Sequence, residues 1–418
     1  MKKLAVLCLL FLPVLAMADD KLSSGDTAWM LVATAFVMLM TPAGLALYYG
    51  GLTRSKNIIN TISMSLISFA IGTIVWVVVG YSLAFGDGDF IGSGKMFLSG
   101  ITPDTLSGNI PELLFIAFQG TFASIAVAIA SGSMIERVKF STFVIFATLW
   151  VVAVYAPVTH WAWGGGETLN FDEIDFAGGT VVHINAGVAG FVVAMILGKR
   201  KDYERKAIKP FSPIFVALGA ALLWFGWFGF NAGSELSADG VAANAFLVTN
   251  VAASVGVIGW LAIEYFVYKK ATLVGGASGA VAGLVAITPA SGTAGVTDAL
   301  IIGFIGGVLG FLGVSKFKKI FRVDDSLDAF WVHGLVGIWG SIATAIFIAD
   351  YAMPENYNMF EQLGRQVKAI GLTMLYSGVM TAVVYFIASA LSGGGRVDEE
   401  TETIGLDEVI HGEKSINL

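Results

Sequence analysis

The chain has 418 residues, of which 56% are hydrophobic and 13% charged; the formal net charge is −7 and the mean hydropathy +0.78. Soluble domains carry roughly 25% charged residues, so this composition excludes an ordinary soluble domain and predicts a protein that crosses a membrane many times. The 51 glycines favour closely packed helices in such a protein.

The first 18 residues are predicted to be a cleaved signal peptide. Lys2 and Lys3 precede an apolar stretch at 4–15, and small residues that suit a cleavage site follow it. The alternative is a first transmembrane helix, which the short apolar stretch and the acidic residues after it disfavour. Cleavage would also remove Cys8, the only cysteine, and with it any disulfide or cysteine-bound metal.

Eleven apolar stretches follow, each long enough for the roughly 20 residues that a membrane-spanning helix needs. Their approximate limits are 27–49, 57–85, 111–134, 140–159, 178–198, 210–233, 242–268, 272–290, 296–316, 329–349 and 365–391. The predicted fold is therefore an all-α polytopic membrane protein with eleven transmembrane helices in a domain of residues 19–391. Residues 392–418 are rich in glycine and then in acids, and are predicted to be a cytoplasmic tail.

Basic residues test the orientation of these helices. They gather in alternate loops, at positions 54–56, 137–139, 199–209, 269–270 and 316–322. The other loops hold few basic residues, such as Lys95, and several acids. Loops rich in Lys and Arg stay on the cytoplasmic side. The mature N-terminus is therefore predicted to be periplasmic and the C-terminus cytoplasmic, in the cell inner membrane.

One pattern occurs twice, at the start of the predicted fifth and tenth helices. An acid, a histidine eight residues later and two glycines in the same register form the two copies: Asp175, His183, Gly187 and Gly190, and Asp325, His333, Gly337 and Gly340. The fifth helix runs inward and the tenth outward. Helices 1–5 and 6–10 are therefore predicted to be inverted repeats, a common build of transporters with the substrate path between the halves. The eleventh helix lies outside the repeat.

His183 and His333 are the candidate pore residues. A histidine within an apolar helix is costly in lipid unless it faces a cavity or a partner. Two neutral imidazoles that share a proton could offer one donor and one acceptor to a small polar solute. Two histidines satisfied by neighbouring carbonyls are the alternative, and a metal site is disfavoured because further ligands are missing.

Acids precede both histidine helices. Asp175 is predicted to cap the amides of Gly178, Gly179 or Thr180 at the start of its helix. Asp325 and Asp328 are predicted to play the same part at the tenth helix. Direct binding of a cation by Asp175 is the less favoured alternative.

Aromatic residues form a third set. Phe118 and Phe122 share one face of the third helix, Trp163 precedes the fifth, and the sixth carries WFGWFGFNAGS at 224–234. Aromatic faces can hold a small cation by cation–π attraction, worth roughly 0.5–2 kcal/mol. An interfacial aromatic belt would explain Trp163 alone, and ordinary packing could explain Phe122 and Phe230.

At these residues the chain resembles the ammonium transporter family, which is related to the Rhesus proteins. The resemblance covers the mature chain and is carried by DFAGGTVVHINAGVAGFVVAMILGKR (175–200), QGTFA (119–123), WFGFNAGS (227–234), ITPASG (287–292) and DAFWVHG (328–334). It implies a homotrimer with one pore in each subunit. It also implies that a PII-type signalling protein binds the cytoplasmic face, where the tail contributes.

The resemblance assigns site residues by motif. Ammonium recruitment falls to Trp163, Ser234 and Phe122, the gate to Phe122 and Phe230, the pore to His183 and His333, and supporting places to Asp175, Phe118, Trp227, Asn231 and Thr288. Glu235 departs from the family pattern, where a small residue is expected.

The function predicted is an ammonium transporter that also takes methylammonium, needs no cofactor or metal, and is no enzyme. Ammonium would lose its proton below the aromatic mouth, and ammonia would then cross the apolar pore while the proton is relayed separately. The alternatives are an electroneutral, Rhesus-like channel for ammonia or carbon dioxide, and an ammonium sensor that signals through a cytoplasmic partner.

Overall fold

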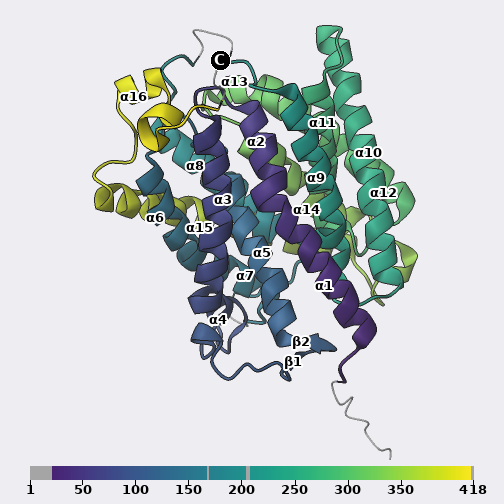
Figure 1. Cartoon of the computed structure of the whole chain (residues 1–418). Helices are drawn as coiled ribbons and strands as arrows, with labels where there is room; N and C mark the ends of the chain where they lie inside the picture. Colours follow the sequence, from purple (N-terminus) through teal and green to yellow (C-terminus); the bar gives the residue numbers. More distant parts are fainter. Residues whose placement is uncertain (1–20, 167–168, 204–207, 416–418) are drawn as a thin grey trace, which may run out of the picture.

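The computed structural model describes residues 21–166, 169–203 and 208–415, and it is almost entirely helical within them. The predicted signal peptide, 1–18, lies outside the described residues. The helices stand side by side, with the C-terminal end on one face and a short β-hairpin on the other (Figure 1). We call the face that bears the tail and loops 53–57, 132–139, 198–203 and 322–329 the C-terminal face.

Each of the eleven predicted spans coincides with an apolar helix in the described part of the chain. Ten are long enough to cross a membrane: Ser24–Leu52, Ile58–Phe85, Glu112–Ser131, Phe140–Trp163, Gly179–Leu197, Pro213–Glu235, Gly240–Tyr268, Leu273–Ala290, Val296–Phe321 and Met359–Leu391. The helix at the tenth predicted span is shorter, Phe330–Ile346. The chain is therefore a multi-pass membrane protein, as the apolar stretches predicted.

Several spans join α-helical, π-helical and 3₁₀ pieces. In chain order the pieces are α1 (Ser24–Leu39), η1 (Met40–Leu45), α2 (Ala46–Leu52), α3 (Ile58–Val75), η2 (Trp76–Gly80), α4 (Tyr81–Phe85), α5 (Glu112–Ser131), α6 (Phe140–Trp150), η4 (Val151–Tyr155), α7 (Ala156–Trp163), η5 (Gly179–Ile184), α8 (Asn185–Leu197), α9 (Pro213–Ala232), η6 (Gly233–Glu235), α10 (Gly240–Tyr268), α11 (Leu273–Ile287), η7 (Thr288–Ala290), α12 (Val296–Leu312), η8 (Gly313–Phe317), α13 (Lys318–Phe321), η9 (Phe330–Leu335), α14 (Val336–Ile346) and α15 (Met359–Leu391).

The remaining described elements lie outside the spans. They are η3 (Met96–Leu98), the antiparallel hairpin of β1 (Leu106–Ser107) and β2 (Ile110–Pro111), η10 (Asp350–Ala352), α16 (Glu399–Ile404) and η11 (Asp407–His411).

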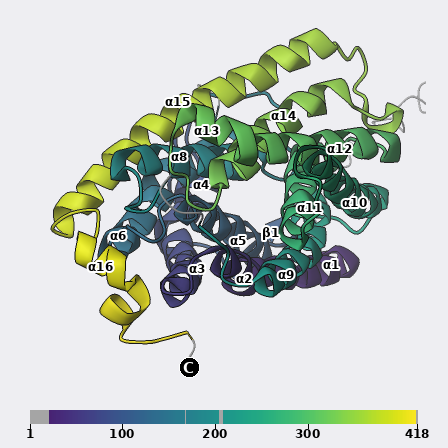
Figure 2. The same ribbon diagram turned by 90° about the horizontal axis from the view of Figure 1, so that it is seen from above.

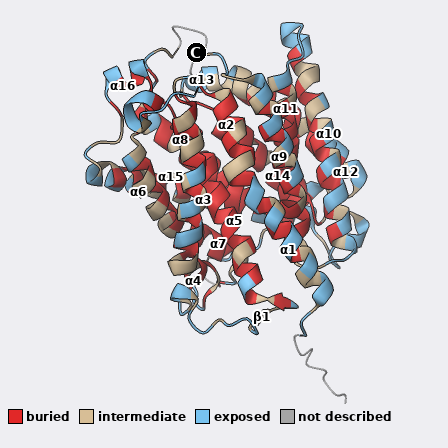
Figure 3. Cartoon of the chain, viewed as in Figure 1, coloured by how far each residue is buried: buried red, intermediate tan, exposed pale blue. Residues whose placement is uncertain are grey.

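Burial separates an inner set of helices from an outer set. The most apolar stretch of α5 is 89% buried, whereas that of α15 is only 33% buried. Seen from above, α15 runs along the outer edge of the bundle beside α8 and α6 (Figure 2). Buried residues fill the middle of the bundle and exposed ones follow its outside (Figure 3). The spans that contain α5, α8 and α11, which are 78–89% buried, therefore form the interior of the bundle.

An ionic network joins the loops of the C-terminal face. The carboxylate of Glu136, which is fully buried, accepts hydrogen bonds from Arg54 and Arg200 at 2.9 and 2.8 Å. Arg200 also pairs with Asp324 through its backbone and its guanidinium, at 2.8–2.9 Å. Loops that are more than 120 residues apart in the chain are thereby held together.

The tail is docked on the same face. Asp407 accepts hydrogen bonds from the backbone N–H groups of Ile59 and Asn60, at 3.0 and 2.9 Å, and so caps the start of α3. Arg396 donates to the carbonyls of Leu197 and Lys199, at 2.7 and 2.8 Å. Through residue 415, the predicted tail is thus ordered against the loops.

Pairing with arginine keeps the buried carboxylates of the network ionised. Burial alone would raise the pKa of Glu136, but Arg200 and then Arg54 hold it well below its usual range. Burial likewise opposes ionisation of Asp324, and Arg200 lowers its pKa all the same. Both carboxylates are therefore charged throughout the physiological range.

We expect Glu136→Gln to destabilise the protein by about 3–5 kcal/mol, because it removes the buried negative charge that Arg54 and Arg200 share. A carboxylate with a depressed pKa stabilises the fold at every pH above its unfolded pKa of about 4.3, and this stabilisation is lost as the pH falls through the folded value. The difference in thermal unfolding from the wild type should therefore stay constant from about pH 8 to about pH 5.

The matched control is Glu361→Gln, which removes an exposed pair with Arg365 and should shift the midpoint little. A difference for Glu136→Gln that shrinks already between pH 7 and pH 6 would contradict the assigned direction of the pKa shift.

Candidate functional site

Two carboxylates fix the starts of the histidine helices. Asp175 accepts hydrogen bonds from the amides of Gly178 and Gly179 at 3.0 and 2.5 Å, and from Thr180 and Val181 at 2.9 and 3.2 Å. The predicted bonds to Gly178, Gly179 and Thr180 are thus present. Burial raises the pKa of Asp175, and these backbone donors lower it only in part.

Asp325 does the same for η9. Its carboxylate accepts from the amides of Ala329 and Phe330 at 3.1 and 2.9 Å, and from the hydroxyl of Ser133 at 2.7 Å. The prediction that Asp328 shares this part is wrong. Its φ of 63° turns the backbone out of the helix, and its carboxylate instead accepts a hydrogen bond from Lys318 Nζ at 2.7 Å.

Glycines let the two histidine segments touch. A Cβ on Gly187 would lie 2.5 Å from the backbone nitrogen of Gly334, and one on Gly337 would lie 3.2 Å from Cβ of His183. Such close backbone contact is possible only between small residues. Two of the four glycines in the repeated pattern, Gly187 and Gly337, therefore set how closely the two histidine segments approach.

The histidines meet in the interior. Nδ1 of His183 lies 3.2 Å from Nδ1 of His333, and the two rings are nearly parallel at 27° with centroids 5.2 Å apart. Only 1% and 3% of their surfaces are exposed. Within the described residues, the buried Nε2 of His183 has no hydrogen-bond partner. One Nδ1 must donate to the other, so the pair shares a single proton between its facing nitrogens.

Aromatic rings continue from the histidines toward the opposite face. Phe230 lies 6.0 Å from the ring of His183 and stacks on Phe122 at 4.1 Å and 20°. Phe122 in turn meets the ring of Trp163 edge-on at 6.1 Å. We call these five rings the aromatic column: Trp163, Phe122, Phe230, His183 and His333.

Four of the remaining predicted residues surround this column. Trp227 stacks on His183 at 5.4 Å and donates its indole N–H to Thr288 at 2.9 Å. Phe118 lies 4.9 Å from Phe122. Asn231 donates to Thr249 at 2.9 Å, one shell further out.

The hydroxyl of Ser234 donates to the carbonyl of Phe230 at 2.8 Å, one helical turn back. The indole N–H of Trp163 donates to the carbonyl of Asp175 at 2.9 Å. The predicted site residues thus lie in the column or next to its members, in contact or in sequence.

Sequence reasoning did not single out Tyr48 and Ser278. Their hydroxyls are 2.9 Å apart, and both residues line a cavity that reaches Val332, the neighbour of His333. Polar residues inside apolar spans were the available signal. Thr249 could have been found in the same way.

Polar groups this deep among apolar helices are typical of proteins that pass a solute across the bilayer. A polytopic membrane transport protein is the class that this fold and site define. Comparison with known proteins narrows the class, because the model of the Ammonium Transporter Family matches residues 28–416. The chain belongs to the ammonium transporter family, and ammonium is its substrate class.

Relatives match over nearly the whole chain. An ammonium transporter of Aquifex aeolicus is 48% identical over 412 residues, which are 96% of this chain and 95% of that protein. One from Bacillus subtilis is 47% identical over 94% of this chain and 98% of its own length.

Among solved structures, Mep2 of Saccharomyces cerevisiae matches with a TM-score of 0.84 and 33% identity, covering 91% of this chain and 89% of its own. A structure titled Sensor Amt Protein matches with a TM-score of 0.85 and 31% identity, covering 92% and 97%. The fold of the described chain is therefore shared with these two solved structures.

We expect Gly187→Ala to abolish transport or to reduce it by an order of magnitude, because the added methyl group would press on the backbone at Gly334 and separate the histidines. The measurement is ammonium-evoked current in proteoliposomes, with purified protein checked for a single species by gel filtration. Gly371→Ala, in α15 with no neighbour within 4 Å of the added atom, is the control and should conduct normally. Normal current in Gly187→Ala would show that the crossing does not set the pore geometry.

Proposed function

We propose that the chain recruits ammonium at the Trp163 end of the aromatic column, removes its proton, and conducts ammonia past the histidine pair. The pair itself carries this proposal. Its imidazoles are the only rings of the described column with a nitrogen that lacks a hydrogen-bond partner, Nε2 of His183, since the indole N–H of Trp163 is already bound to a carbonyl.

Aromatic faces support recruitment. Trp163 and Phe122 offer π-faces, and Ser234 offers a hydroxyl oxygen close by, so a small cation could gain roughly 0.5–2 kcal/mol from cation–π attraction alone. Asp175 takes no direct part in this step, because backbone amides occupy its carboxylate. The supporting residues Phe118, Trp227, Asn231 and Thr288 hold the rings in place.

Apolar surroundings support loss of the proton. Phe122 and Phe230 are fully buried and stack across the path, so they act as a gate that must move to let a solute pass. A full charge below this gate would face a penalty of several kcal/mol without water or counterions. Neutral ammonia avoids that penalty.

The tautomers of the pair support a relay. If Nδ1 of one imidazole donates to Nδ1 of the other, the first ring presents an acceptor at Nε2 and the second presents a donor. Ammonia can use both kinds of group. The proton crosses separately, relayed in part by this pair, and the net transfer is one ammonium ion.

The same proposal covers orientation and assembly. The basic loops and the tail share the C-terminal face, which we place in the cytoplasm of a cell whose inner membrane holds the protein. Residues 1–18 are the cleaved signal. The helix that follows Asp175 ends near Arg200, which contacts Asp324 just before the helix that follows Asp325. The two helices therefore begin at opposite faces, which supports two inverted repeats.

Large apolar side chains remain exposed on α1, α9, α10 and α12 of the single chain, and a homotrimer would cover part of them. The ordered tail and charged loops give a PII-type signalling protein a surface to bind.

Replacement of both His183 and His333 by Ala, or of His183 by Asp, should abolish selective ammonium-coupled current in proteoliposomes, because the shared proton is lost. His411→Ala, in the tail, is the control for loss of a histidine elsewhere. Unchanged current and unchanged exclusion of potassium in the pore variants would rule out the relay. Ammonia flux without any current in the wild type would favour the Rhesus-like gas channel.

We expect Trp163→Leu to raise the ammonium concentration at half-maximal current by about 2- to 30-fold, the range that a lost cation–π contact predicts. The maximal current should change less, because the histidine pair is untouched. Concentration series of evoked current would measure both. Trp339→Leu is the control, since its indole binds the carbonyl of Ile302 away from the column. An unchanged half-maximal concentration would remove Trp163 from recruitment.

A further inference from the structure

A two-part cavity opens between the histidine pair and the C-terminal face. Its parts have volumes of about 450 and 350 Å³ and share the lining residues Leu52, Val274, Val314, Lys319, Leu327 and Asp328. The second part reaches Tyr48, Ser278 and Val332, next to His333. A solute that leaves the pore under the proposed function must cross this space.

Most charged side chains that line the cavity already have an ion-pair or hydrogen-bond partner. Arg200 is paired with Asp324 and Glu136. Glu264 accepts hydrogen bonds from the amide and hydroxyl of Thr272, at 3.0 and 2.9 Å, and so holds the start of α11. Asp328 is different, because its carboxylate lies on the wall of both parts of the cavity and its partner is a single lysine.

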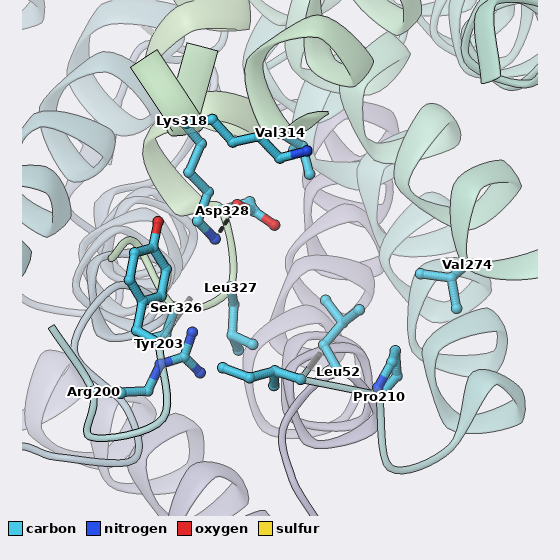
Figure 4. A pocket seen from close by; sticks show the side chains of 12 residues that line it. Leu52, Arg200, Tyr203, Pro210, Val274, Val314, Lys318, Ser326, Leu327 and Asp328 are labelled. Atoms are coloured by element: carbon cyan, nitrogen blue, oxygen red, sulfur yellow. Dashed lines mark hydrogen bonds and ion pairs between the residues drawn. The ribbon is translucent and has the colours of Figure 1, made fainter. Parts of the chain in front are cut away.

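That lysine is Lys318, at the first position of α13. Its Nζ donates to Asp328 Oδ1 at 2.7 Å and to the carbonyl of Asp325 at 2.5 Å. In Figure 4 its side chain reaches along the cavity and ends at Asp328. The side chains of Lys318 and Asp328 keep 14% and 23% of their surfaces exposed, so the pair borders the cavity and is not sealed from it.

The backbone of Asp328 indicates that this placement is specific. Its φ of 63° is an uncommon left-handed conformation for a residue other than glycine. Asp325 already accepts the helix amides that Asp328 could have capped. The turn therefore directs the carboxylate of Asp328 to the cavity, where it meets a primary ammonium group.

Chemistry links this pair to the transported solute. The head group of lysine is an alkylammonium with three N–H donors, as in methylammonium, and a carboxylate with a carbonyl oxygen beside it would bind a free ammonium ion equally well. A tethered group competes at a high effective concentration, which reaches the millimolar range for short flexible links.

Resting on the proposed function, we propose that Lys318 is a built-in competitor that fills a cation site at Asp328 and the carbonyl of Asp325. Its role is to keep the ammonium ion that re-forms in the cavity from being held at the exit. Lys318 therefore speeds the release of ammonium from the cavity. It takes no part in the proton relay.

The test uses Lys318→Met and Lys318→Gln in the full chain. Ammonium-evoked current is measured in proteoliposomes whose lumen holds methylammonium chloride or the same concentration of sodium chloride. Luminal methylammonium should inhibit both variants about 2- to 5-fold more strongly than the wild type. This range corresponds to loss of one partly exposed ion pair, here the pair of Lys318 with Asp328. Luminal methylammonium also changes the driving force for transport, but it does so equally for the wild type and the variants, so this effect cancels in the comparison.

Two controls isolate the site. Lys319→Met removes the neighbouring lysine of the same cavity and should behave as the wild type. Lys318→Met combined with Asp328→Asn removes the site as well as its occupant, so the extra inhibition should disappear.

The inference is overturned if Lys318→Gln conducts with wild-type inhibition, or if the extra inhibition persists in the double variant. A wild type without any ammonium-evoked current would overturn the proposed function instead, so the two failures are distinguishable.

Discussion

Two imidazoles in an apolar interior constrain the rest of this structure. Each ring has two nitrogens that need partners, and lipid-facing helices supply none. The rings satisfy one nitrogen each by facing one another at 3.2 Å. That distance depends on close contact between the two segments, in which glycines at 187 and 337 leave no Cβ to press on Gly334 and His183. The carboxylates of Asp175 and Asp325 then fix where the two segments begin. The histidine pair thus depends on close backbone contact between the two segments that carry it.

Hydrophobicity and spacing predicted most of the fold. Eleven apolar stretches had the right length, and each one is a helix in the described chain. The repeated Asp–His–Gly pattern placed His183 beside His333, because an ionisable residue within a span must find a partner. The aromatic residues were predicted less directly, since the resemblance to a family, and not periodicity, separated Phe122 and Phe230 from ordinary packing.

Long-range polar contacts could not be predicted in this way. Glu136 meets Arg200, and Asp407 caps α3, across 64 and 348 residues of chain. Such pairs leave no period in the sequence, and several acids and bases in the loops were equally plausible partners. Asp328 shows the same limit at short range. Two acids three residues apart both suited a helix start, and only the backbone conformation shows that Asp325 takes the amides.

The two ends of the proposed path differ in the charged and polar groups that they offer to a cation. At the Trp163 end, the proposed attraction comes from ring faces and a hydroxyl, groups that bind a cation weakly and release it readily. In the middle, the described column holds no full charge besides what the histidine pair can take up. At the C-terminal face, carboxylates line the cavity, but Asp328 is paired with Lys318 and Glu264 accepts hydrogen bonds from Thr272. A cation is therefore favoured at the mouth and disfavoured at the gate. In the cavity at the C-terminal face, each lining carboxylate already has a partner, so under the proposed function solute would be collected on one side and not held on the other.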